Sequence, residues 1–300
     1  MATSGRNETR APRGIAWTRA RARIWTRGRG ARGVVLHGIL IALAALWLFP
    51  FVWMLLSSLK TADETFHQQT FFPRAWDVDN YARALSTIPY LRYTLNTAIV
   101  AVANVAGTLL SCAPPAYALA RLRWPGRDAL FLIVLSTMLL PYPVTIIPLY
   151  IMFSNLGMVN TFWPLIIPGF FGNAFYIFLL RQFFRGIPAE LNDAGVVDGA
   201  SELGIFLRII LPLSGPALSV VALLTFLANW TDYFGPLIYL QGNSSLWTLS
   251  LGLRDFQSAH FIAWGPLMAA SVMFMLPVIT LFLVAQRTFV QGIALTGVKG

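Results

Sequence analysis

The sequence predicts an all-α, polytopic membrane protein with six transmembrane helices. Of its 300 residues, 57% are hydrophobic and only 11% are charged, and the mean hydropathy is +0.65. Soluble domains have about 25% charged residues. The charges also fall in gaps between long apolar runs, and a helix of about 20 apolar residues crosses a bilayer. These observations predict a bundle of membrane helices.

Charged residues delimit the apolar runs. The 52 residues between Asp128 and Arg181 carry no charge, which is too many for one span, and the polar stretch Ser154–Thr161 divides them in two. Pro50 is expected to kink the first span. We expect spans at about 34–58, 92–117, 129–152, 162–183, 213–239 and 262–286.

Basic residues predict the orientation of these spans. The N-terminal tail, the 121–128 and 181–211 connections and the C-terminus together hold 17 of the 22 basic residues. Because basic loops remain in the cytoplasm, both termini are expected to be cytoplasmic, in a multi-pass protein of the cytoplasmic (inner) membrane.

Residues 1–33 form a separate region with nine arginines and few core-forming side chains, so we expect a disordered cytoplasmic tail. A basic tail could bind nucleic acid, but one that precedes a span is better explained by anionic lipid headgroups. We therefore expect a lipid bilayer and no nucleic acid as its partner. The apolar run that follows is too long for a signal peptide and is interpreted as an uncleaved span.

Patterns for catalysis or cofactor binding are missing from the sequence. The three histidines are far apart, Cys112 is the only cysteine, and residues 292–299 depart from a phosphate-binding loop by a valine before the lysine. Asp232 is the one plausible acid at membrane depth, which disfavours ion-coupled transport. We expect no enzyme activity, no metal and no cofactor bound by this chain.

A polar segment at Arg185–Pro212 interrupts the apolar runs. Pro188 is a suitable first helical residue, and Asp198-Gly199 is a turn signal, so two short helices should meet at Gly199. Pro212 then opens the next span. The segment is either an interfacial amphipathic helix or a docking element for a partner. Four residues at helical spacing predict an apolar face on the second helix: Leu203, Phe206, Leu207 and Ile210.

This segment resembles the EAA loop of ABC-importer permease subunits, whose pattern is E-A-A-x3-G-x9-I-x-L-P. Asp193-Ala194-Gly195, Gly199 and Ile209–Pro212 match that spacing without a gap. Asp193 replaces the glutamate, and Gly195 replaces the second alanine, which should loosen the first helix by about 1 kcal/mol. Further matches across residues 34–300 resemble carbohydrate permeases of the maltose-type second subunit: 117–126, 156–161, 178–184, 187–191, 230–237 (with Thr231 for the usual asparagine), 286–287 and 297–300.

The resemblance implies one subunit of a sugar importer. Two different permeases form the pathway, two cytoplasmic ATPase subunits bind ATP and Mg²⁺, and an extracytoplasmic solute-binding protein delivers the sugar. Residues 187–212 would be the coupling-helix loop between spans 4 and 5, with small residues at the bend for close approach and acids that set the docking register. The implied coupling residues are Glu190, Asp193, Ala194, Asp198, Gly199, Ala200, Phe206 and Pro212.

Polar and aromatic residues in spans 2, 4 and 5 are candidates for the sugar pathway. For each, a role in helix–helix contact or in an interfacial belt explains the residue equally well. The alternatives to a sugar importer are a permease of the same architecture for a polyol phosphate or polyamine, and an ATP-independent secondary transporter or membrane scaffold. The pathway candidates are Asn104, Asn173, Asn229, Trp230 and Tyr233.

Overall fold

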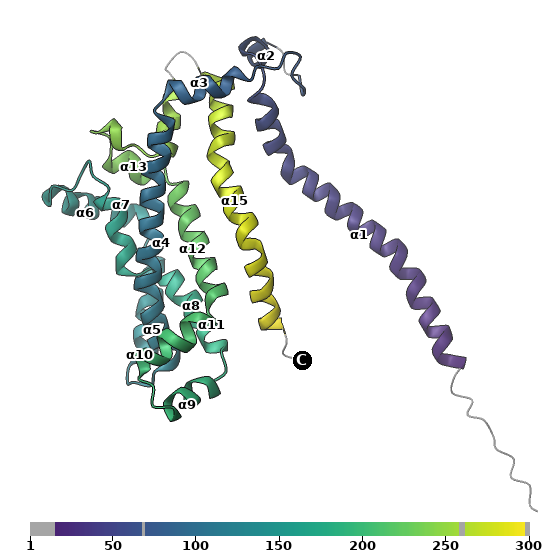
Figure 1. Ribbon diagram of the computed structural model, residues 1–300, viewed down its shortest axis with the longest axis vertical. Coiled ribbons are helices and arrows are strands. Elements are labelled where there is room, and N and C mark those ends of the chain that lie inside the picture. The colour runs from purple at the N-terminus through teal and green to yellow at the C-terminus, as the bar shows by residue number, and fades with distance from the viewer. Residues whose placement is uncertain (1–15, 68–69, 258–261, 298–300) are drawn as a thin grey trace, which may run out of the picture. The chain divides into compact units, whose positions relative to one another are not determined.

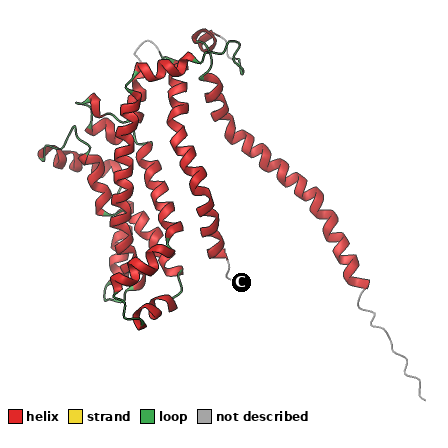
Figure 2. Ribbon diagram, viewed as in Figure 1, coloured by secondary structure: helices red, strands yellow, loops and turns green. Residues whose placement is uncertain are grey.

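The computed structural model describes residues 16–67, 70–257 and 262–297. The regular secondary structure of this part of the chain is helical, apart from one isolated bridge between Gln257 and Ile262 (Figure 2). The predicted all-α class is therefore confirmed. The chain divides into two units, residues 1–55 and residues 56–300, each of which is described by itself.

Helix α1 (Ala16–Ser57) contains the first predicted span. Residues Gly33–Ser57 are long and apolar enough to cross a membrane, and the helix continues through Pro50. Helix α1 begins at Ala16 and so includes residues 16–33 of the tail that the sequence predicts to be disordered, whereas residues 1–15 lie outside the described residues. Alanine and arginine are strong helix formers, and a helix already nucleated by the apolar run extends at little cost.

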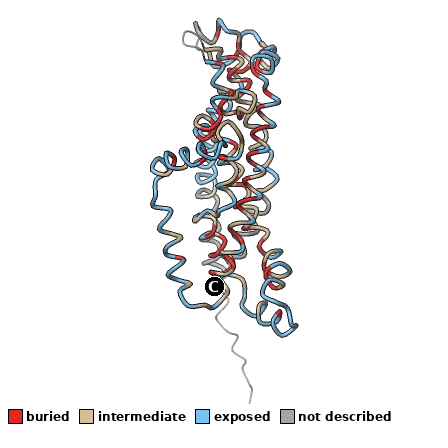
Figure 3. The backbone as a smooth tube through the Cα atoms, turned by 90° about the vertical axis from the view of Figure 1, so that its left-hand side faces the viewer, coloured by how far each residue is buried: buried red, intermediate tan, exposed pale blue. Residues whose placement is uncertain are grey.

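Helix α4 (Tyr90–Arg121) contains the second predicted span and is the helix around which unit 56–300 is built (Figure 1). One buried cluster, which includes Tyr90, Tyr93 and Leu249, lies at its N-terminal end. A second cluster, around Tyr117 and Leu180, lies at its C-terminal end. Figure 3 shows the buried residues distributed along the length of the bundle.

The third predicted span is bent rather than straight. Helices α5 (Arg127–Ser136) and η1 (Thr137–Leu139) are followed by α6 (Tyr142–Asn155) at an angle of 92°. The predicted span at about 129–152 therefore corresponds to a bent pair of helices that can form one span. Leu140 is extended because a residue before proline, here Pro141, avoids the helical conformation.

The fourth predicted span is interrupted. It consists of α7 (Trp163–Ile166), η2 (Ile167–Phe171) and α8 (Ala174–Gly186), with a break at Gly172, whose φ is +84°. Asn173 begins α8, because its side-chain oxygen accepts hydrogen bonds from the next helical N–H groups at 3.0 and 3.3 Å.

The fifth predicted span is shorter than expected. Helix α12 (Gly215–Trp230) ends before Asp232, and α13 (Phe234–Tyr239) is a separate helix, so the predicted span 213–239 is not one continuous helix. The carboxylate of Asp232 causes the break, because it accepts two N–H groups at the start of α13, both at 3.1 Å. A bend of 76° also separates α12 from the helices that precede it.

Helix α15 (Trp264–Gly297) contains the sixth predicted span. Among the described residues, four helices are long and apolar enough to cross a membrane, or up to six if each bent pair forms one span. The remaining elements outside the 187–212 segment are short: α2 (Ala62–His67), α3 (Asp79–Thr87), η4 (Ser244–Leu246), α14 (Leu249–Gly252) and η5 (Leu253–Phe256).

Asn104 joins α4 to α7, since its side-chain amide donates to the Leu165 carbonyl at 2.9 Å. Asn104→Ala should lower the unfolding free energy in detergent by about 1 kcal/mol, the usual range for a hydrogen bond between membrane helices. Thermal unfolding of the purified chain measures the change. Asn229→Ala is the matched control, because Asn229 donates only to Thr225 of its own helix. Equal destabilisation by both variants would contradict the prediction.

Candidate functional site

Residues 187–212, hereafter the elbow, form a bend between α8 and α12. They contain α9 (Glu190–Val197), α10 (Glu202–Ile205) and the π-helical segment η3 (Phe206–Ile210), after which α11 (Leu211–Leu213) begins. Two short helices therefore meet at Gly199, as the turn signal predicts. In Figure 1, α9 lies at the end of the unit remote from α3.

Backbone hydrogen bonds fix the bend. The N–H of Ala200 donates to the carbonyl of Gly195 at 2.9 Å, and that of Gly199 donates to Val196 at 3.0 Å. This pair of bonds is a Schellman motif, which requires a left-handed residue after the helix. Gly199 supplies it with φ +75°. Ser201 then caps α10 by accepting the N–H of Gly204 at 3.2 Å.

The tip of the elbow, residues 196–200, is exposed, and no other part of the described chain covers it. A side chain built at Gly199 would meet no atom within 4 Å. Val197 is 87% exposed and Val196 is 58% exposed, so the tip is partly apolar. Six of the predicted coupling residues lie exposed on this tip or on α9: Glu190, Asp193, Ala194, Asp198, Gly199 and Ala200. Their three carboxylates make no ion pair within the described part of the chain.

The other two predicted coupling residues lie away from the tip. Phe206 is buried at the start of η3, and Pro212 is exposed in α11. The predicted apolar face is wrong in part: Leu203 and Leu207 are exposed, and Ile205 is buried instead. The i→i+5 bonding of η3 explains the difference, since it shifts which residues share a face relative to an α-helix.

Gly195 lets the two arms of the elbow pack together, namely α9 before the bend and α10 with η3 after it. It is buried, and an added Cβ would lie 3.0 Å from Ile205 Cγ1 and 3.1 Å from Ile209 Cδ1. The loosening of α9 by this glycine stays a prediction from helix propensity. Its missing side chain also allows α9 to approach η3, which the sequence did not indicate.

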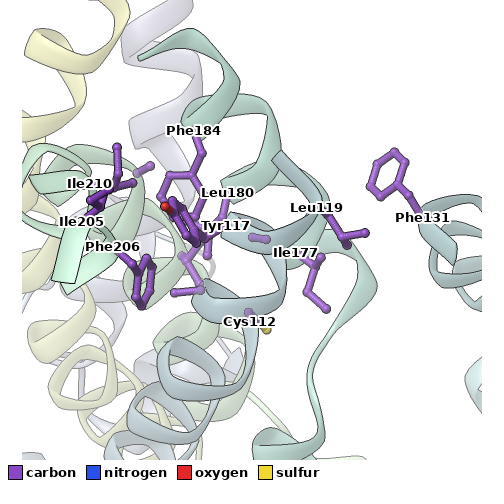
Figure 4. Close-up of a cluster of buried hydrophobic side chains, with 14 residues drawn as sticks. Cys112, Tyr117, Leu119, Phe131, Ile177, Leu180, Phe184, Ile205, Phe206 and Ile210 are labelled. Atoms are coloured by element: carbon purple, nitrogen blue, oxygen red, sulfur yellow. The ribbon is translucent and has the colours of Figure 1, made fainter. Parts of the chain in front are cut away.

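Side chains of α4 attach the elbow to the bundle. The Tyr117 hydroxyl donates to Glu202 at 2.9 Å and accepts from the side-chain amide of Asn192 at 3.4 Å. Its ring lies 5.0 Å from that of Phe206, centroid to centroid, and Figure 4 shows it directed toward η3. One turn later, the Arg121 guanidinium donates to the carbonyl of Ile187, where the elbow begins.

Arg181 holds α8, α4 and α5 together above the elbow. Its side chain is only 6% exposed. Its Nε donates to the Leu119 carbonyl at 3.0 Å, and its guanidinium carbon lies 3.8 Å from the centre of the Phe131 ring. Asp128 lies 3.4 Å from one of its nitrogens and supplies the opposite charge. A charge this deeply buried requires such partners, which identifies Arg181 as a structural element.

Four of the five pathway candidates have hydrogen bonds within the chain: Asn104, Asn173, Asn229 and Trp230. The amides of Asn104 and Asn229 bond to carbonyls of neighbouring turns or helices, and Asn173 caps α8. Trp230 is buried and donates to the Phe274 carbonyl at 3.0 Å. Tyr233 is exposed between α12 and α13.

Sequence reasoning missed four residues of the elbow's support: Tyr117, Arg121, Asn192 and Glu202. Tyr117 and Arg121 lie in the matched stretch 117–126, and their i, i+4 spacing on one helix face was a usable signal. No comparable signal pairs Tyr117 with Glu202, which is 85 residues away. Among the described residues, no group of three or more potential metal ligands occurs.

Comparisons with known proteins identify the fold and the family. Residues 103–295 match the family described as "Binding-protein-dependent transport system inner membrane component". The chain is 33% identical to the probable ABC transporter permease protein YurM of Bacillus subtilis strain 168, over 93% of this chain and 91% of that protein. It is 32% identical to the arabinooligosaccharides transport system permease protein AraQ of Halalkalibacterium halodurans, over 86% and 93% of the two chains.

A solved structure agrees with these relatives. A chain of a bacterial ABC transporter involved in the import of the acidic polysaccharide alginate superposes with a TM-score of 0.76 at 26% identity, covering 88% of this chain and 98% of that one. The resemblance drawn from the elbow sequence is thereby confirmed. The chain belongs to the ABC-transporter permeases that form the binding-protein-dependent transport system inner membrane component family.

Proposed function

We propose that this chain is one of two different permease subunits of a sugar or oligosaccharide importer in the cytoplasmic membrane. Two ATPase subunits bind ATP and Mg²⁺ and hydrolyse the ATP, and an extracytoplasmic binding protein delivers the solute. Both termini and the elbow face the cytoplasm. This chain binds no nucleotide, and its elbow transmits the motion of the ATPase subunits to the membrane helices.

The exposed tip of the elbow is the observation that carries this proposal. A bend with a partly apolar tip, three unpaired carboxylates and open space at Gly199 suits insertion into a cleft of a partner. Apolar surface supplies affinity, and the acids at Glu190, Asp193 and Asp198 orient the contact. The family membership makes an ATPase the appropriate partner.

The solute class rests on the relatives. AraQ is named for arabinooligosaccharide transport and the structural neighbour for alginate import, so a sugar is the best-supported solute. Lys and Arg are missing from the interiors of the predicted spans apart from the paired Arg181, which favours a neutral solute over an anion.

Two measurements test this function. A tagged chain purified in mild detergent from its own host should retain a polypeptide with a Walker loop, and the purified complex should hydrolyse MgATP.

A thermal-shift screen of the binding protein that belongs to this complex, against neutral sugars, polyamines and polyol phosphates, should select a sugar. If a polyamine or a polyol phosphate stabilised the binding protein instead, that class would be the solute. If the chain purified without any ATPase, the proposed importer function would be wrong.

Gly199→Arg should reduce the amount of ATPase that co-purifies with the chain at least tenfold. The strain of a non-glycine residue at positive φ is shared by Gly199→Ala, which adds only a methyl group and serves as the control. Arginine adds bulk at a tip that is open in this chain, so the added loss reports the partner's cleft. The ratio of ATPase to permease in the purified complex measures the effect. Equal retention by the two variants would remove the tip from the docking surface.

Gly195→Val should also weaken ATPase capture, although Gly195 lies beneath the tip. The added side chain would force α9 away from Ile205 and Ile209 and so reorient the tip. Gly186→Val is the control, since a Cβ there meets no atom within 4 Å. The same co-purification ratio applies, with the amount of chain in the membrane as a check on insertion. Unchanged capture in Gly195→Val would show that the two arms need not pack closely.

A further inference from the structure

The hydroxyl of Tyr117 contacts both arms of the elbow. Glu202 belongs to the arm after the bend and lies 2.9 Å from the hydroxyl. Asn192 belongs to the arm before the bend and lies 3.4 Å from it. One atom of α4 therefore bridges two helices whose relative angle is set at Gly199.

The surroundings of Tyr117 make this bridge stiff. The residue is 5% exposed, and its ring packs against Phe206, which follows α10 directly. A hydrogen bond from a shielded hydroxyl to a carboxylate is stronger than a bond between neutral groups. Arg121 adds a separate attachment at Ile187, so α4 holds the elbow at its entrance and at both arms.

The connection from the elbow to α12 has a different construction. The elbow ends in the π-helical η3 and the start of α11, and a bend of 76° near Ser214 and Gly215 then leads to α12. A π-helical turn and a sharp bend interrupt the regular α-helical hydrogen bonds, so the helix axis can bend there. The route to α4 has no such break, because it consists of direct side-chain contacts.

We propose that Tyr117 is a positioning residue that locks the elbow to α4, so that the two move as one body when the ATPase moves the elbow. The role in transport rests on the function proposed above. The lock itself is a property of this chain and is testable without the ATPase. Motion then reaches α4 directly, in addition to the route along the chain into α12.

The first experiment measures the lock in the full chain in lipid nanodiscs. Spin labels replace Val197 at the tip and Leu110 on α4, both exposed, in a Cys112→Ala background. Pulsed electron paramagnetic resonance gives the distribution of distances between the labels. The labelled chain that keeps Tyr117 should give one narrow distribution of distances. Tyr117→Phe keeps the ring but loses the hydroxyl, and should raise the population outside that distribution about tenfold.

Two further variants separate positioning from general stability. Tyr90→Phe removes another buried hydroxyl of α4, which donates to the Ala270 carbonyl at 3.2 Å at the opposite end of the helix. It should leave the distribution narrow. Glu202→Gln keeps an oxygen that accepts the Tyr117 hydrogen bond and should also remain narrow, whereas Glu202→Leu should resemble Tyr117→Phe. A narrow distribution in Tyr117→Phe, or equal broadening in Tyr90→Phe, overturns the lock.

The second experiment repeats the distance measurement in the complex with its ATPase, with and without MgATP. On adding MgATP, the distance between the labels at positions 197 and 110 should stay constant in the chain that keeps Tyr117. In Tyr117→Phe the same distance should change. A distance that changes in the chain that keeps Tyr117 overturns the single-body motion. Failure of the proposed function has a different signature, namely a chain that purifies without any ATPase while its nanodisc distribution is still narrow.

Discussion

The hydrogen bonds at the C-terminal end of α4 are the interactions on which the arrangement of unit 56–300 depends. Arg181 reaches this end from α8, and Arg121 and Tyr117 reach from it to the elbow. Each bond joins segments that are more than 60 residues apart in the chain. Tyr117 and Arg181 are buried, so water does not replace these partners, and the polar groups enforce one arrangement of the helices.

The same constraint explains where the bundle tolerates broken helices. Each interruption is accompanied by a local polar partner or a residue that suits it: Asn173 caps α8, the carboxylate of Asp232 begins α13, and Gly172 takes the positive φ. The irregular backbone is thus supported from within the chain. Of these residues, Asn173 is a pathway candidate by sequence, and the structure uses its side-chain oxygen to begin α8.

The elbow combines a rigid base with an open tip. Its base is packed, through Gly195 against Ile205 and through Tyr117 against Phe206. Its tip carries exposed valines, carboxylates and a glycine with free space around it. A partner that inserts there meets a surface whose orientation is set by the base, which is the property that a lever between two proteins requires.

The sequence alone determined the all-α class, the runs long enough to span a membrane, the bend at Gly199 and the family, because hydrophobic run length, turn residues and motif spacing are local properties. Only the tertiary structure decided the attachment of Arg181 to Leu119, of Arg121 to Ile187 and of Tyr117 to Glu202. These features depend on contacts between residues distant in the chain. No local pattern encodes which carboxylate will lie beside which hydroxyl once the helices have packed.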